Sequence, residues 1–337
     1  MDLSIVVPVY NEEAALPALL QRLDAAVAAL AEEEGEGFAA EYLFVDDGSS
    51  DGSRALLQHW ASQDARIRWV GLSRNFGHQV ALAAGLDHAR GQAVAVLDAD
   101  GQDPPELLPA LWRSYRQGNQ VVYAQRRSRP GDGPLKRATA HLFYRILSRL
   151  ARVEVPLDTG DFRLLARPVV EALRRMPEQH KFLRGQVAWL GFRQAAVPFD
   201  RGNRSGGRSA YGLGRLFRLA LDGLTSLTNW PLRLATYLGF LASGVAFVLI
   251  LYALWSYFIA QSTVPGWTSL MIAVLFLGGA QLISMGIIGE YLARLHDNVR
   301  QRPLYVVEDA NVAPTPSSPP PSSAPQTPSA ASGSWGR

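Results

Sequence analysis

A long stretch without charge limits what this chain can fold into. From Leu234 to Gly289 the sequence contains no Asp, Glu, Lys or Arg. A membrane-spanning helix needs about 20 apolar residues, and this stretch holds two such segments with a Pro265-Gly266 break between them. The sequence therefore predicts a hairpin of two transmembrane helices within residues 232–294.

Basic residues indicate how this hairpin lies in the membrane. The loop from Ala260 to Thr268 has no Lys or Arg, whereas arginines flank the hairpin on both sides, namely Arg215, Arg218 and Arg233 before it and Arg294, Arg300 and Arg302 after it. Because Lys and Arg are usually retained on the cytoplasmic side, we expect a multi-pass protein of the plasma membrane with both termini in the cytoplasm. A signal peptide is not expected, since Asp2 is acidic and the apolar run Ile5–Val9 is too short.

The sequence before the hairpin alternates between short apolar runs and helical patterns. We expect buried strands at Leu3–Val7, Glu41–Val45, Ile67–Leu72, Ala93–Leu97 and Gln120–Gln125. We expect helices from Asn11 to about Glu33, from Ser50 to Gln63, from Val80 to Ala89 and from Pro105 to Gln117. This alternation predicts an α/β fold with a doubly wound, mostly parallel sheet.

Polar residues close four of these strands. They are Tyr10-Asn11-Glu12, Asp46-Asp47, Arg74-Asn75 and Asp98 with Asp100. Asn, Asp and Ser also begin helices and make turns, so each cluster alone has an ordinary structural explanation. Together they belong at the carboxyl ends of parallel strands, where open α/β sheets bind their ligands.

Three aspartates follow the strand Ala93–Leu97. Asp98 and Asp100 are two residues apart on a tight connection, so their oxygens can turn towards one hard cation, which commonly also holds a substrate diphosphate. Alternatively, Asp98 merely ends the strand and Asp103 caps a helix that begins at Pro104. We expect Asp103 to cap this helix in either case. The spacing alone is compatible with both interpretations.

Other segments surround the hairpin. Residues 134–151 and 213–231 are expected to form basic amphipathic helices, which either lie on an anionic membrane surface or pack on the domain. The hairpin that follows favours the membrane for the second helix and, more weakly, for the first. Residues 295–309 are expected to be a cytoplasmic segment in which Pro303–Val307 is a candidate strand. Residues 310–337, rich in Pro, Ser and Ala, are expected to be a disordered tail.

Composition and motifs exclude several classes of function. The absence of cysteine excludes disulfides and cysteine metal sites, and a net charge of +3 is too small to indicate a nucleic-acid partner. No G-x-G-x-x-G follows the first strand, which argues against a dinucleotide site. Gly202–Ser209 imitates a Walker A loop but lacks the strand before it and the helix after it. This loop suits either the wrapping of phosphates or a flexible basic linker near anionic lipid headgroups.

Several motifs together resemble the family-two glycosyltransferases. They are Val6–Glu13, Val45–Gly52, Ser73–Gln79, Asp98–Glu106, Gly160–Leu164 and Arg204–Tyr211. Their order is similar to that of the polyprenyl-phosphate glycosyltransferases with two C-terminal membrane helices, over residues 1 to about 308. The resemblance implies a GT-A fold, a nucleotide-sugar-binding α/β domain, for residues 1–212.

The resemblance also implies a set of site residues. The nucleotide sugar would contact Pro8, Tyr10, Glu12, Asp46, Asp47, Asn75, Gln79 and Asp98. Mg²⁺ or Mn²⁺ on its diphosphate would bind Asp98 and Asp100. The acceptor phosphate would contact Arg201, Arg204, Arg208 and Ser209, and catalysis would involve Asp103, Asp161 and Arg204.

The acceptor implied is a polyprenyl phosphate, and the product is a polyprenyl-phosphate sugar formed with inversion. A phosphate monoester has its second pKa near about 6, so its oxygen is already largely ionised at neutral pH and needs little deprotonation. Asp161 resembles the position proposed as the base in related enzymes. Its role is therefore open between abstracting a proton, orienting the acceptor and pairing locally with Arg163.

Two positions depart from the family pattern. Ala210 stands where the family loop has Lys, and Gly101 stands where the metal motif usually has an apolar residue.

Two other functions stay open. A processive polysaccharide synthase would carry Gln-x-x-Arg-Trp, but Gln186–Trp189 lacks the arginine. A membrane-anchored nucleotide-sugar sensor would not need carboxylates at every strand end. The resemblance further implies a homo-oligomer, a tetramer in related enzymes. The sugar depends on the shape of the loops around the pocket, and the nucleotide and the choice between undecaprenyl and dolichyl phosphate stay open.

Overall fold

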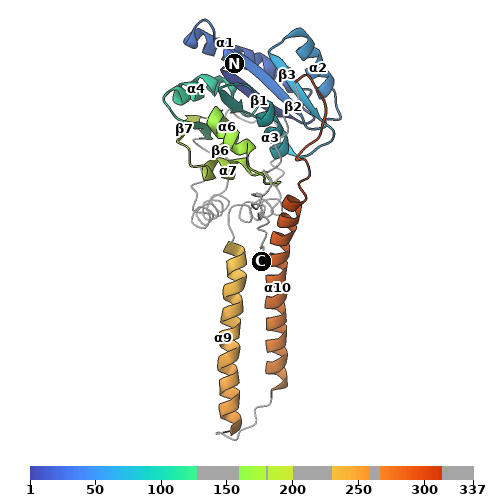
Figure 1. The fold of residues 1–337 in the computed structure, drawn as a ribbon, viewed down its shortest axis with the longest axis vertical. Helices are drawn as coiled ribbons and strands as arrows, with labels where there is room; N and C mark the ends of the chain where they lie inside the picture. Colours follow the sequence, from blue (N-terminus) through green and yellow to red (C-terminus); the bar gives the residue numbers. More distant parts are fainter. Residues whose placement is uncertain (127–158, 180, 200–229, 259–265, 313–337) are drawn as a thin grey trace, which may run out of the picture.

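A computed structural model describes residues 1–126, 159–179, 181–199, 230–258 and 266–312 of the chain. Figure 1 shows an α/β domain at one end of the molecule and two long helices that extend away from it. The last described residues return from the second helix to the domain, so both ends of the described chain lie in or beside the sheet.

One sheet organises the α/β domain, with the strand order β7-β5-β6-β4-β1-β2-β3-β8. Its strands are β1 (Leu3–Val9), β2 (Ala40–Asp46), β3 (Ile67–Leu72), β4 (Ala93–Val96), β5 (Val121–Arg126), β6 (Thr159–Ala166), β7 (Gln194–Phe199) and β8 (Val307–Ala310). The first four strands are parallel to one another, with β4, β1, β2 and β3 in that spatial order. The strands β6 and β8 run antiparallel to their neighbours.

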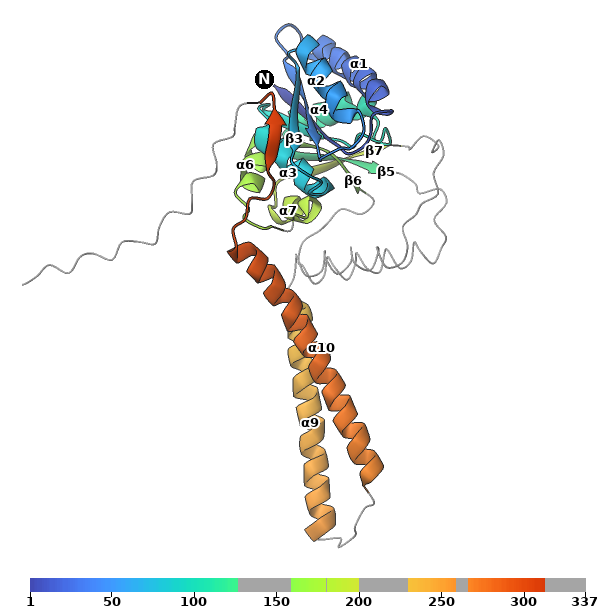
Figure 2. The same ribbon diagram turned by 90° about the vertical axis from the view of Figure 1, so that its right-hand side faces the viewer.

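Helices cover both faces of this sheet, as Figures 1 and 2 show. One face packs on α1 (Leu16–Glu34), α2 (Ser53–Gln63), the short 3-10 helix η1 (Pro105–Leu107) and α4 (Leu108–Arg116). The other packs on α3 (His78–His88), α6 (Arg167–Arg174) and α7 (Leu183–Trp189). Side chains of β1 alternate between the two cores, since Ile5 and Val7 belong to the first and Val6 to the second.

The doubly wound, mostly parallel sheet expected from the sequence is confirmed by this strand order. The first helix begins later than expected, at Leu16, because Asn11, Glu12 and Glu13 form a turn instead. The strands β6 and β7 were not expected. The strand β6 escaped prediction because Asp161 and Arg163 interrupt its apolar run, although both side chains are buried.

The apolar hairpin folds as the helices α9 (Trp230–Phe258) and α10 (Trp267–Val299), with Gly266 at the N-cap of α10. They lie side by side in both views. Both expose large apolar side chains, among them Phe240, Val245, Phe276 and Leu282. Within the described residues one stretch, Phe276–Val299, is long and apolar enough to cross a membrane, and Ala235–Leu249 is a shorter apolar stretch.

The segment after α10 differs from the expectation in its register. The strand lies at Val307–Ala310 rather than at Pro303–Val307, and it pairs with the edge strand β3. Val312 is also buried, so the domain extends past residue 310, where we expected the tail to begin. The expected helix at 134–151, most of that at 213–231 and the tail from residue 313 lie outside the described residues.

Candidate functional site

A cavity of about 310 Å³ opens at the carboxyl ends of the parallel strands. It is lined by Pro8, Val9, Tyr10, Glu12, Asp47, Asn75, Gly77, His78, Ala81, Asp98, Ala99 and Asp100. These residues come from the ends of β1, β2 and β4, from the loop after β3 and from the start of α3. The cavity thus brings together residues that are up to 92 positions apart in the sequence, from Pro8 to Asp100.

The turn Tyr10–Glu13 lies at one wall of this cavity, and hydrogen bonds join it to a second turn, Ser49–Ser53. The backbone N–H of Asn11 donates to Ser49 Oγ at 3.0 Å, and its side chain accepts from the N–H of Ser50 at 2.8 Å. The N–H of Glu12 donates to Ser53 Oγ at 3.1 Å. Asn11 adopts a left-handed conformation with φ of 57°, which asparagine tolerates better than most residues. The two turns therefore hold the cavity residues Tyr10 and Glu12 in place as one unit.

Adjacent aspartates at the end of β2 have different surroundings. Asp47 lines the cavity, and its carboxylate accepts the backbone N–H groups of Phe76 at 2.7 Å and Gly77 at 2.9 Å. Burial raises the pKa of Asp47 above its ordinary value despite these bonds. Asp46 is fully buried and does not line the cavity, since its carboxylate accepts from Arg54 Nε at 2.6 Å and from the N–H of Ser49 at 3.1 Å.

The residues after β4 place two carboxylates at the cavity. Asp98 Oδ1 is buried and has no hydrogen-bond partner, although His78 Nε2 lies 3.4 Å away. Burial raises the pKa of Asp98, and the charges of Asp161 and Asp100 add to this effect, while His78 opposes it. Asp100 is exposed and accepts the N–H of Gln102 at 3.0 Å. The cavity therefore holds a buried carboxylate oxygen that a cation would satisfy.

Asp103 does not line the cavity. The N-cap position of η1 is Pro104 rather than Asp103, because the 3-10 helix begins one residue later than expected, at Pro105. The Asp103 carboxylate instead accepts the backbone N–H of Asp98 at 3.3 Å. Asp103 thus supports the loop that carries Asp98.

The donor set of this cavity fits a divalent cation that is shared with a substrate. Glu12, Asp47, Asp98 and Asp100 are acidic, and no Lys or Arg is among the described residues that line the cavity. The pKa of Glu12 is raised by burial and by the charges of Asp100 and Asp51, so negative charges crowd here. No group of three or more His, Asp or Glu in the described part of the chain could hold a metal alone. Two carboxylates plus substrate oxygens are typical of Mg²⁺ sites.

Asp161 lies behind the cavity in a buried cluster of charges. Its Oδ1 accepts from Arg184 Nε at 2.8 Å and lies 3.6 Å from Arg163 Nη2, while its Oδ2 accepts from Gln79 Nε2 at 3.1 Å and lies 3.2 Å from His78 Nε2. Burial alone would raise the pKa of Asp161, but His78 and the two guanidinium groups hold it well below its ordinary value. Such a carboxylate is ionised and is a weak proton acceptor.

The geometry sorts the residues expected from the sequence into three groups. Those that line the cavity are Pro8, Tyr10, Glu12, Asp47, Asn75, Asp98 and Asp100. Those that do not line it are Asp46, Gln79, Asp103 and Asp161, and Gln79 is bound to Asp161 and to the N–H of Leu183. Those outside the described residues are Arg201, Arg204, Arg208 and Ser209.

Sequence reasoning missed two residues of the charge cluster. His78 touches both Asp98 and Asp161, and its pKa is raised because these carboxylates outweigh the effect of burial. It lies in the motif Ser73–Gln79, which was a signal that could have singled it out. Arg184, on α7, had no such signal, because only the fold brings it to Asp161.

The sequence is similar to known proteins over most of its length. Residues 4–174 match the model of glycosyl transferase family 2, and residues 230–295 match that of the GtrB C-terminal hairpin. The chain is 42% identical to the uncharacterized glycosyltransferase YkcC of Bacillus subtilis, over 90% of this chain and 93% of that one. It is 37% identical to the prophage bactoprenol glucosyl transferase homolog of Escherichia coli (91% and 99%) and 36% identical to the bactoprenol glucosyl transferase of Shigella phage SfII (92% and 99%).

These matches confirm the resemblance and the GT-A type of fold that it implied. The C-terminal hairpin match agrees with the paired helices α9 and α10 and supports association with a membrane. The chain is a glycosyltransferase and belongs to glycosyl transferase family 2.

Proposed function

We propose that this enzyme moves a sugar from a nucleotide-diphosphate sugar to a polyprenyl phosphate, with inversion at the anomeric carbon. The observation that carries this proposal is the acidic cavity at the carboxyl edge of the sheet, with the buried, unbonded Asp98 Oδ1 beside exposed Asp100. The names of the relatives from Escherichia coli and the Shigella phage support the lipid acceptor.

The donor site is proposed to use the residues that line the cavity. The turn with Tyr10 and Glu12 would receive the nucleoside, because Tyr10 offers an aromatic face that is half exposed and the turn is held by hydrogen bonds. Asn75 on the facing loop closes the same cavity. Asp47 would keep that loop in position through the N–H groups of Phe76 and Gly77.

Asp98 and Asp100 are proposed to bind Mg²⁺ or Mn²⁺ together with the diphosphate. A bound divalent ion supplies positive charge that stabilises the departing diphosphate. A cavity with four acidic side chains would otherwise repel this anionic substrate. Burial raises the pKa values of Glu12 and Asp98, and neighbouring carboxylates raise them further, so a cation that offsets this negative charge would be favoured here.

Asp161 is proposed to orient groups rather than to abstract a proton. An acceptor phosphate oxygen attacks the anomeric carbon, the bond from that carbon to the diphosphate breaks, and the nucleoside diphosphate leaves. The phosphate arrives ionised, so the step needs no strong base. Asp161 holds Arg184, Gln79 and His78 at the rear of the cavity, which fixes their positions for substrate binding. Arg201, Arg204, Arg208 and Ser209 remain our candidates for the acceptor phosphate.

Both α9 and α10 are proposed to cross the membrane, with the catalytic domain and both termini in the cytoplasm. The uncharged stretch Leu234–Gly289 and the arginines on either side of it support this topology. A cytoplasmic domain would meet nucleotide sugars in solution and lipid phosphate at the inner leaflet. We further propose a homo-oligomer.

The transfer reaction can be tested with the purified full chain. Labelled UDP-glucose, UDP-N-acetylglucosamine and GDP-mannose are each incubated with Mn²⁺ and undecaprenyl phosphate, and label is then extracted into organic solvent. We expect lipid-linked label from one donor, which EDTA or omission of the lipid abolishes. Tight nucleotide binding without any lipid-linked label would instead favour a sensor, and label in a long polymer would favour a polysaccharide synthase.

A further inference from the structure

The segment that follows α10 returns to the catalytic domain and binds the edge of its sheet. The strand β8 pairs antiparallel with β3, and the N–H of Ser73 donates to the carbonyl of Val306 at 3.0 Å. Asn311 Oδ1 accepts the N–H of Trp69 at 2.7 Å, and its side-chain amide donates to the carbonyl of Ile67. Figure 2 shows this strand beside β3, directly above the end of α10. The second membrane helix is thereby linked to the sheet.

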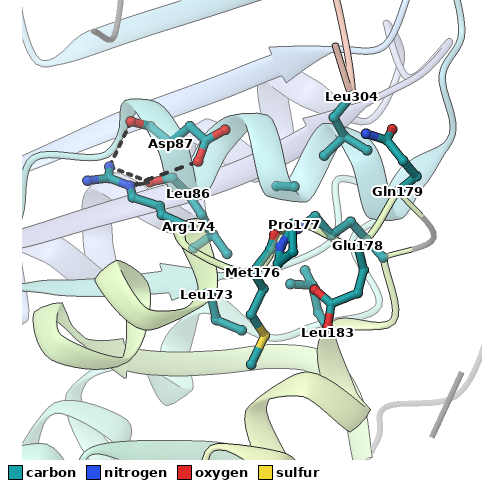
Figure 3. Close-up of a pocket in the computed structure, with 12 residues that line it drawn as sticks. Leu86, Asp87, Leu173, Arg174, Met176, Pro177, Glu178, Gln179, Leu183 and Leu304 are labelled. Atoms are coloured by element: carbon teal, nitrogen blue, oxygen red, sulfur yellow. Dashed lines mark hydrogen bonds and ion pairs between the residues drawn. The ribbon is translucent and has the colours of Figure 1, made fainter. Parts of the chain in front are cut away.

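Further contacts extend this docking towards α10. Tyr305 donates its hydroxyl to Asp87 at 3.0 Å, and Gln179 binds both the side chain of Asn298 and the carbonyl of Arg302. Leu304 lies at a second cavity of about 210 Å³ between the end of α3 and the α6–α7 connection, next to Gln179 in Figure 3. The segment is therefore held along its length rather than at the strand alone.

One side chain connects this docked segment to the donor site. The Arg54 guanidinium, on α2, contacts Glu308 of β8 at 2.5 Å through Nη1 and Asp46 at 2.6 Å through Nε, and it donates to the carbonyl of Leu72 at 2.8 Å through Nη2. Arg54 thus donates to residues of three strands, β8, β2 and β3. Such a planar fork fixes the relative positions of its partners in a way that a lysine could not.

Asp46 links Arg54 to the wall of the donor cavity. Its second oxygen accepts the N–H of Ser49, whose hydroxyl accepts the N–H of Asn11. Asn11 lies between the cavity residues Tyr10 and Glu12. A continuous chain of contacts therefore runs from Glu308 through Arg54, Asp46 and Ser49 to the turn that forms the cavity wall.

We propose that Arg54 and Glu308 are positioning residues for donor binding, so that the turns at the donor site reach their binding geometry when the segment after the second membrane helix is docked. The inference rests on the proposed function. Neither side chain is among those that line the cavity, so each would act through Asp46 and the turns. The simpler alternative is that β8 only covers the edge of the sheet, in which case the Glu308 charge has no effect on the donor.

Glu308→Gln tests the link, and Asp309→Asn is its matched control. Both remove one carboxylate from the same exposed strand and leave the backbone pairing intact. Asp309, however, contacts Gln58 at 3.5 Å rather than Arg54. Hydrogen exchange of the full chain in detergent is measured without ligand, and donor KM is measured with UDP-glucose or whichever labelled donor gives transfer, with Mn²⁺ and undecaprenyl phosphate.

For Glu308→Gln we expect faster exchange in peptides covering residues 10–13 and 46–53, and a donor KM raised about two- to fivefold, as an exposed ion pair permits. The acceptor KM and the exchange of α10 should not change. Arg54→Lys should raise the donor KM further, because Asp46 then loses its fork partner. Asp309→Asn should match the unmodified chain in all these measurements.

Equal exchange at residues 46–53 and equal donor KM in the Glu308→Gln and Asp309→Asn variants would overturn the proposal. A rise in acceptor KM alone would also contradict it, since the link would then serve membrane placement. The proposed function fails separately, when the unmodified chain transfers no sugar from any donor. In that event the exchange measurement still decides whether Glu308 holds the turns.

Discussion

Asp161 shows how the surroundings of a single carboxylate decide what it can do. The side chain is buried, yet four polar groups of His78, Gln79, Arg163 and Arg184 surround it. The two-residue spacing in the sequence predicted Arg163 as a partner of Asp161. Arg184 could not be predicted as a partner, because it lies 23 positions away in the sequence. For single residues, the sequence identified polar and charged candidates, and the fold shows which of them line the cavity.

The role of Asp161 leads to a contrast between substitutions. General-base catalysis commonly contributes about 10²–10⁴-fold to a rate, so loss of a true base would cost at least that much. We expect Asp161→Asn to lower kcat by less than about 100-fold, whereas Asp98→Ala and Asp100→Ala should abolish transfer. Single-turnover rates with saturating donor make the comparison. Complete loss in Asp161→Asn with normal donor binding would restore the role of base.

The free energy of unfolding should depend on pH through His88. Burial, together with the nearby charges of Arg68 and Arg174, lowers the pKa of His88 from 6.5 to about 4. Between pH 6.5 and about pH 4, His88 is protonated in the unfolded chain but not in the folded chain. The free energy of unfolding is therefore highest at neutral pH and decreases as the pH falls through this range. The loss between pH 7 and 4 should reach about 3 kcal/mol.

Thermal unfolding of the full chain in detergent, measured from pH 7 to pH 4, checks this expectation. His88→Gln removes the titrating group, so its melting temperature should fall less over this range than that of the unmodified chain. His59→Gln, on the exposed face of α2, serves as the control. Parallel curves for the His88→Gln variant and the unmodified chain would show that His88 does not contribute.

At the scale of elements, periodicity predicted the parallel strands well and the later strands poorly. The strands β1 to β4 are buried, and each contains a continuous apolar run beside single charged residues such as Glu41 and Arg68, so their positions were recognisable. The strand β7 is only partly buried, and β6 carries charges inside the domain, so neither presents that pattern. The turns after the strands were recognised as polar clusters, but their mutual hydrogen bonds depend on tertiary contact.

Gly48 tests how closely these turns must approach each other. It has φ of 70°, and an added Cβ would lie 2.5–2.9 Å from backbone atoms of Arg74 and Asn75. Gly118 also has positive φ, at 90°, but has nothing within 4 Å of an added Cβ. Both Gly48→Ala and Gly118→Ala should lower stability by about 1–3 kcal/mol through backbone strain.

Only Gly48→Ala should affect the donor site, because only there must the loop of Asn75 move. We expect its donor KM to rise at least about tenfold, as small misplacements at active sites are costly. Steady-state kinetics of the two variants makes this comparison at a temperature where both are folded. A similar donor KM in both variants would mean that the loop tolerates displacement.

At the scale of the whole molecule, the absence of charge from Leu234 to Gly289 predicted the paired helices α9 and α10, which are 29 and 33 residues long. The 33 residues of α10 extend about 50 Å, more than the roughly 30 Å of a bilayer core. With α10 across the membrane, as proposed, the remaining length reaches from the bilayer core to the domain. The docking of β8 was only partly foreseen, because a four-residue edge strand has too little pattern to give its register.

The chain contains no cysteine, so single cysteines can report the proposed topology without interference. Ser262→Cys lies in the connection between the two helices and Ser62→Cys lies on the exposed side of α2. In intact cells a membrane-impermeant maleimide should label Ser262→Cys, and it should label Ser62→Cys only after the membrane is opened. Labelling of Ser62→Cys in intact cells would place the catalytic domain outside.

The central claim is that a divalent ion held by Asp98 and Asp100 presents the donor. The full chain is crystallised with Mn²⁺ and the donor nucleotide, and anomalous diffraction at the manganese edge locates the metal. We expect one peak within coordination distance of both carboxylates, about 2.0–2.6 Å, in contact with the diphosphate, and no peak in Asp100→Ala. A nucleotide bound in the cavity with its manganese away from these two side chains would contradict the account.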